Sequence, residues 1–137
     1  MISAMHEDDS PELIEVARIL KDVLEIPDVP LKVRKLIVNL CNAVTRRVAR
    51  LAAAGIGGIL KKIGRDGSGG ITGGRTRTGV KMRGTVVTIE GCLYTSYTMF
   101  REYLHEALWE ILGEDIAPHV IPKVIEDGPR TVLMLAM

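Results

Sequence analysis

The sequence predicts a mainly α-helical fold, namely a small helical bundle with one long basic amphipathic helix and a minor β-hairpin or C-terminal strand. Three stretches repeat apolar residues at intervals of three and four, the spacing of helices that pack one face on a core. One short run, Thr-Val-Val-Thr-Ile at 85–89, is rich in β-branched residues and predicts a strand. The chain of 137 residues is long enough for a single domain with a real core.

Four segments make up this predicted single domain. Residues 1–9 form a polar, acidic arm, and residues 10–64 form the helical part. Residues 65–74 form a glycine-rich loop, and residues 75–137 contain a strand, a helix and the C-terminal tail.

A first helix is expected over residues 11–25. Ser10 is a favourable N-cap, and Pro11 suits the first helical position because its missing N–H has no partner there in any case. Pro27 and Pro30 end this helix and force a short connection to the next one.

The second helix is expected from about Pro30 to at least Leu51, with Ala54 as its further limit. Its predicted apolar face consists of Val33, Ile37, Leu40, Val44, Val48 and Leu51. The roughly opposite side carries Lys35, Asn39, Asn42, Arg46 and Arg50. An ordinary solvated helix surface is the alternative interpretation of that polar side, but such a surface mixes charges of both signs, and no acid occurs between Lys32 and Arg65.

Glycines interrupt the helical pattern between residues 55 and 64, and each interior glycine costs a helix about 1 kcal/mol relative to alanine. Three interpretations fit this segment: a second short helix, a helix packed closely against a neighbouring backbone, or an interfacial segment with Lys61 and Lys62 beside lipid headgroups. We favour close packing, because small residues let another surface approach.

The segment that follows the loop alternates basic and uncharged residues. Arg75, Arg77, Lys81 and Arg83 occupy alternate positions, so an extended strand would present all four on one face. A strand or hairpin is therefore expected between residues 75 and 90.

A third helix is expected from Ser96 or Thr98 to Leu112, ended by Gly113. Residues 116–125 are expected to form a short helix interrupted by two prolines. The apolar tail, residues 131–137, is expected either to pair with the strand at 85–89 or to dock on another subunit.

Positive charge is concentrated in the middle of the chain. Residues 30–84 contain thirteen bases and one acid, a net charge of +12, while the flanking parts carry −6 and −5. Such a block is typical of a surface that faces a polyanion. The candidate nucleic-acid-binding residues are Lys35, Asn39, Asn42, Arg46, Arg47, Arg50, Lys61, Lys62, Arg65, Arg75, Arg77, Lys81 and Arg83.

No catalytic residue, metal ligand set or cofactor is predicted, and the chain is not expected to be an enzyme. Residues 69–76 have the spacing of a phosphate-binding P-loop, but they lack the preceding strand and following helix that such a loop requires. Cys41 and Cys92 are interpreted as small buried residues, with a single bridge as the alternative. No stretch is long enough to span a membrane and no secretory signal is recognised, so folding in the cytoplasm is expected.

The chain resembles the coat proteins of filamentous viruses that infect hyperthermophilic archaea. The resemblance lies in its architecture and charge, carried by Arg46, Arg47, Arg50 and the basic run over residues 65–83. It implies subunits that associate with themselves or with a homologous coat subunit, wrap double-stranded DNA through its phosphates, and reside in the virion after assembly in the host cytoplasm. It also leaves room for contact with a lipid envelope.

The function expected from these features is structural packaging of double-stranded DNA without sequence recognition. A cellular archaeal nucleic-acid-binding regulator or adaptor is the first alternative. A protein that interacts with a membrane surface through residues 51–62 is the second.

Overall fold

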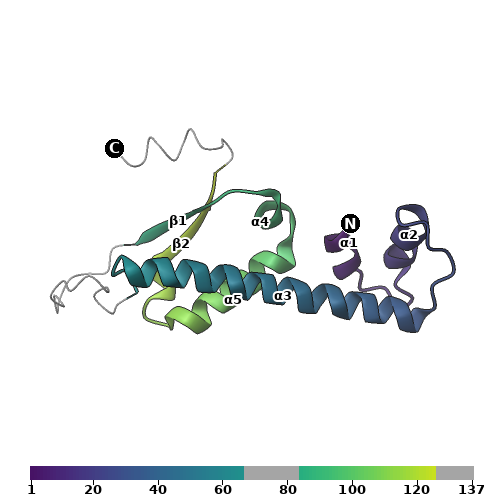
Figure 1. The fold of residues 1–137 in the computed structure, drawn as a ribbon, viewed down its shortest axis with the longest axis horizontal. Coiled ribbons are helices and arrows are strands. Elements are labelled where there is room, and N and C mark those ends of the chain that lie inside the picture. Colours follow the sequence, from purple (N-terminus) through teal and green to yellow (C-terminus); the bar gives the residue numbers. More distant parts are fainter. Residues whose placement is uncertain (67–83, 126–137) are drawn as a thin grey trace. The chain divides into compact units, whose positions relative to one another are not determined.

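The computed structural model describes residues 1–66 and 84–125 (Figure 1). The fold is mainly helical, with one long helix and a small two-stranded sheet, which confirms the predicted class. The elements in chain order are α1 (Ile2–His6), α2 (Ile14–Asp22), α3 (Leu31–Lys62), β1 (Thr85–Ile89), α4 (Cys92–Ser96), α5 (Thr98–Leu112), the short 3-10 helix η1 (Ala117–His119) and β2 (Val120–Val124).

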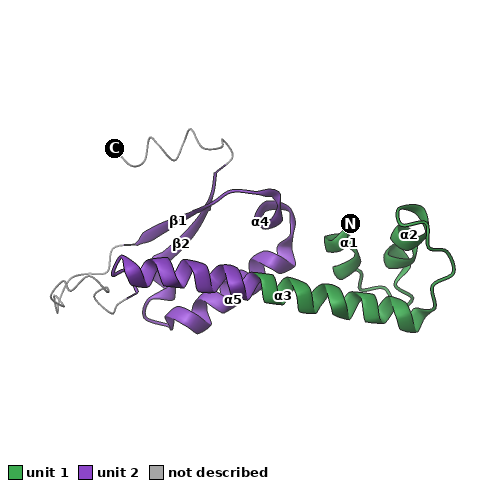
Figure 2. Ribbon diagram, in the orientation of Figure 1, with its two compact units in different colours: residues 1–48 green, residues 49–137 purple. Residues whose placement is uncertain are grey.

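The chain divides into two compact units, residues 1–48 and 49–137, with the boundary inside α3 (Figure 2). The first unit has its own core of five buried side chains: Met5, Leu13, Val16, Ile19 and Leu20. Leu31, Ile37, Val38 and Cys41 of α3 pack against that core. The prediction of a single domain is not tested by this division and stays a prediction.

The helix expected over residues 11–25 is shorter than predicted and spans Ile14–Asp22. Residues 8–10 precede this helix and supply side chains that cap its first amides. The Ser10 hydroxyl accepts a hydrogen bond from the Ile14 amide at 3.0 Å, and Asp8 Oδ2 accepts one from the Val16 amide at 3.0 Å. These side chains satisfy the first free N–H groups of α2, so the helix begins at Ile14.

Helix α3 extends further than expected, and apart from Ile37 the predicted apolar face is exposed. It continues through three glycines to Lys62. Its buried residues are Thr45, Ala49, Ala53, Gly57 and Leu60. By contrast, Leu40 and Leu51 of the predicted apolar face are 61% and 65% exposed. Ala49 and Ala53 are part of the core of the second unit, and their small side chains allow the other core residues to approach the helix closely.

The core of the second unit is built mainly from α4 and α5. Its buried members besides Ala49 and Ala53 are Tyr94, Tyr97, Phe100, Tyr103, Leu104, Ala107 and Leu108. Helix α5 matches the predicted third helix in both bounds and ends at Gly113, whose φ of 77° requires a residue without a side chain.

Strands β1 and β2 form a parallel pair in which Val86 lies opposite Ile121. Strand β1 is confirmed as predicted, but the expectation of a short helix over residues 116–125 is wrong beyond η1. Burial alternates along β2, with Val120, Pro122 and Val124 turned inward, so the period of two prevails over the helical interpretation. The predicted strand face carrying Arg75 and the tail at 131–137 lie outside the described residues.

Candidate functional site

The predicted nucleic-acid-binding residues that the structure describes are divided between the two units. Lys35, Asn39, Arg46 and Arg47 are exposed and belong to the first unit, as does the half-buried Asn42. Arg50, Lys61, Lys62 and Arg65 are exposed and belong to the second unit. Arg75, Arg77, Lys81 and Arg83 lie outside the described residues. Arg50 forms an ion pair with Glu110 of α5, so part of its charge is neutralised within the chain.

The carboxyl edge of the parallel strand pair is the first candidate site. Both strands end on the same side because they run parallel, and the Ile125 amide donates a hydrogen bond to the Ile89 carbonyl at 3.2 Å there. After Glu90, the chain turns at Gly91 with a φ of 122° and enters α4 at Cys92. A side chain at Gly91 would meet no atom within 4 Å, so the described structure is open at this turn.

Sequence reasoning missed this edge, because the edge exists only where β1 pairs with β2, and β2 was not recognised as a strand. Gly91 after a β-prone run was a visible signal, but a glycine that follows one isolated strand indicates only a turn. The site becomes apparent when a second strand, separated by two helices, lies parallel to the first.

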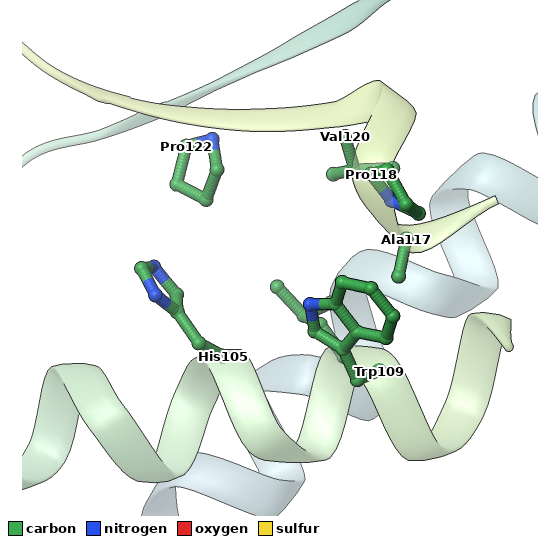
Figure 3. A pocket seen from close by; sticks show the side chains of 7 residues that line it. His105, Trp109, Ala117, Pro118, Val120 and Pro122 are labelled. Carbon is green, nitrogen blue, oxygen red and sulfur yellow. The ribbon is translucent and has the colours of Figure 1, made fainter. Parts of the chain in front are cut away.

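A pocket of about 230 Å³ lies between α5 and the segment from η1 to β2 (Figure 3). His105 and Trp109 project into it from α5 towards the side formed by Pro122, Val120, Pro118 and Ala117. This lining is largely apolar, and it therefore suits a small apolar group more than a charged reactant.

The imidazole of His105 is held by a neighbouring phenol. Its Nε2 lies 2.9 Å from the Tyr94 hydroxyl, and the two ring centroids are 6.1 Å apart. Partial burial, followed by the positive charge of Arg101, lowers the pKa of His105. Burial raises the pKa of Tyr94. His105 is therefore biased towards the neutral form, whose Nε2 either donates a hydrogen bond to the phenol oxygen or accepts one from the phenol hydroxyl, depending on the tautomer.

Neither cysteine forms a disulfide bond. Cys41 is half-buried, and its burial raises the pKa of the thiol. Cys92 is exposed, which contradicts the interpretation of both residues as buried. Among residues 1–66 and 84–125, no group of three His, Cys, Asp or Glu side chains is arranged to hold a metal ion. The same residues contain no helix with the length and hydropathy needed to cross a membrane.

The described fold is a mainly helical unit whose parallel strand pair is joined through helices, and in parallel sheets ligands commonly bind where the strands end. The sequence profile of the family described as Hexokinase matches residues 1–131. The chain therefore belongs to the hexokinase family.

Plant relatives agree with this assignment. The chain is 66% identical over 128 residues to Hexokinase-3 and 65% identical over 137 residues to Hexokinase-4, both of Arabidopsis thaliana. It is 61% identical over 127 residues to Hexokinase-3 of Oryza sativa subsp. japonica. These alignments cover 93%, 98% and 93% of the chain, but only 26%, 26% and 25% of the relatives. The chain thus spans about a quarter of the length of the curated relatives it matches.

The family assignment overturns the functional expectations from sequence. The resemblance to coat proteins of archaeal viruses is wrong, and with it the expectations of a virion location, a non-enzymatic packaging role, and double-stranded DNA or a coat subunit as partner. The physical reason is that a basic block and an amphipathic helix fit many anionic partners and identify none of them. Whether any of the thirteen candidate residues contacts an anion stays a prediction.

Proposed function

We propose that this chain forms part of the catalytic domain of a hexokinase, an enzyme that transfers the γ-phosphoryl group of ATP to a hydroxyl group of a hexose. The observation that carries the proposal is the Hexokinase family match over residues 1–131. Since the relatives are about four times as long, the proposed activity belongs to the complete domain and not to this quarter of it alone.

The carboxyl edge at Gly91 supports this proposal. A glycine in a conformation that side chains rarely adopt leaves the backbone accessible, so a phosphate or hydroxyl group can approach its amides closely. The edge lies where ligands of parallel sheets bind. We therefore expect the turn from β1 to α4 to contact a substrate in the complete domain.

The exposed bases at the end of α3 remain candidates for contact with an anion. Lys61 and Lys62 carry positive charge at the C-terminal end of this helix, and Arg65 follows. The triphosphate of ATP is the anion that the proposed reaction supplies. This contact would be electrostatic and non-directional, since lysine acts as a point charge.

A chimera tests the proposed function. The matching segment of Arabidopsis Hexokinase-3 is replaced by this chain, and ADP formation that depends on both ATP and glucose is measured. An active chimera is the expected result. A chimera that folds cooperatively but forms no ADP above the background without glucose would contradict the proposal.

A further inference from the structure

One face of α3 in the second unit carries apolar residues that nothing among the described residues covers. This open face consists of Leu51, Ala54, Gly55, Gly58 and Ile59, which recur at helical intervals of three and four. Leu51 is 65% exposed and Ile59 is 64% exposed. Large aliphatic side chains at this spacing are typical of a face that packs on another element.

The two glycines of the open face have no explanation within the described chain. A side chain at Gly55 or Gly58 would meet no atom within 4 Å, and neither residue has a backbone conformation that requires glycine. Gly57 provides the contrast, because a side chain there would lie 3.0 Å from Cγ2 of Ile111. Glycine weakens a helix interior relative to alanine, so an exposed glycine pair indicates that another backbone or a large side chain approaches at this point.

One face of the sheet in the same unit is also left uncovered by the described residues. Val86 and Ile121 lie opposite each other in the register of β1 and β2, and they are 54% and 51% exposed. Parallel sheets are normally covered on both faces, and two strands rarely form a stable sheet alone. This outer face of the sheet is thus a second apolar surface, separate from that of α3, that no described residue covers.

We infer that the open face of α3 is an internal docking surface of the hexokinase domain, on which an apolar segment from outside this quarter of the domain packs over Gly55 and Gly58. The inference rests on the proposed function. Its occupant follows from length, since each plant relative contains about three times as much further sequence beside this segment. The docking segment contributes a bulky aliphatic or aromatic side chain that fills the space above the glycines, with Leu51 and Ile59 on either side.

Leucine substitutions at the two glycines of the open face test this surface. In the chimera with Arabidopsis Hexokinase-3, Gly58→Leu or Gly55→Leu is expected to reduce ADP formation or the yield of folded protein by at least about tenfold, because the added side chain occupies space that the docking segment needs. Glu102→Leu, at an exposed position of α5, is the matched control and is expected to change neither quantity more than about twofold.

Thiol labelling gives a second readout that does not depend on activity. The thiol introduced by Gly58→Cys is expected to react at least about tenfold more slowly in the chimera than in the 137-residue chain alone, because docking buries it. Equal labelling rates, or full activity and stability of the Gly58→Leu chimera, would overturn the inference. Loss of stability on Gly58→Leu in the chain alone would also overturn it, since the covering segment would then belong to this chain.

The two proposals fail in different ways. An inactive but folded parent chimera contradicts the proposed function, whereas the labelling comparison at Gly58 still reports on docking. An active chimera that tolerates Gly58→Leu leaves the proposed function in place and removes only the docking surface.

Discussion

Nη2 of Arg50 on α3 lies 2.8 Å from Oε2 of Glu110 on α5, and both side chains are more than half exposed. This ion pair joins a residue that sequence analysis assigned to nucleic acid with an acidic residue of the neighbouring helix. Because water screens exposed charges and each long side chain loses conformational freedom, such pairs contribute little stability.

We predict that Arg50→Gln changes the free energy of unfolding of the chain by less than about 1 kcal/mol. Glu110→Gln and the double variant complete a double-mutant cycle, measured by urea denaturation. A coupling energy above about 2 kcal/mol would show that the pair is far better ordered and less solvated than its exposure indicates.

Gly57→Leu is predicted to destabilise the chain by about 1–3 kcal/mol, because its side chain meets Cγ2 of Ile111 at the buried side of α3. Gly55→Leu is the matched control on the open face and is predicted to be neutral or stabilising by up to about 1 kcal/mol. Thermal unfolding of the two variants beside the parent measures both effects. Equal destabilisation by both would mean that the two faces are equally enclosed.

His105 predicts a pH dependence of stability. Its pKa in the folded chain lies below the usual value near 6.5, so the unfolded chain binds more protons between these two values. Stability should therefore be complete above about pH 6.5 and fall as the pH decreases through this interval. His6 contributes in the same direction, because burial lowers its pKa too.

Urea denaturation between pH 5 and 7.5, compared with His105→Gln and His6→Gln, measures these contributions. Each variant should flatten the decline of stability towards low pH. A slope that neither variant changes would show that both imidazoles titrate alike in the folded and unfolded chain.

Asp8 is predicted to stabilise the first unit through its cap on α2. Partial burial raises the pKa of its carboxyl, but hydrogen bonds from the Ser10 hydroxyl and the amides of Val16 and Ser10 outweigh burial and lower it overall. Asp8→Ala should cost about 1 kcal/mol of unfolding free energy at neutral pH. Asp9→Ala, at the exposed neighbour, is the control and should cost much less.

The contribution of Asp8 should be fully present above its unfolded pKa and be lost as the pH falls below about 4. Stability measurements on the parent and Asp8→Asn between pH 3 and 6 test this sign. A difference between the two proteins that grows towards low pH would contradict the cap.

Local signals were sufficient where the sequence specifies an element by itself. Helix α5 has a regular apolar stripe and Gly113 at its end, so it was predicted with correct bounds. Strand β1 is a continuous β-branched run and lies within the strand or hairpin expected over residues 75–90. Strand β2 has only five residues and contains Pro122, and its conformation depends on pairing with a strand more than thirty residues away. Periodicity alone could not identify it.

The buried face of α3 shows the same limit in packing. The leucine-rich side, with Leu40 and Leu51, has the stronger apolar pattern, yet it is exposed, whereas Ala49 and Ala53 are buried within this chain. Sequence patterns report that a face is apolar and not which neighbour covers it. The functional error had a related cause, since Gly91 becomes part of a candidate site only through the parallel pairing of β1 with β2.

The rate of ATP-dependent glucose phosphorylation by the Arabidopsis Hexokinase-3 chimera tests the central claim most directly. The 66% identity over 128 residues leads us to expect kcat/KM for glucose within about tenfold of the unmodified relative. A chimera that unfolds as cooperatively as that relative but retains less than about one hundredth of its kcat/KM would contradict the claim that this chain forms part of a hexokinase catalytic domain.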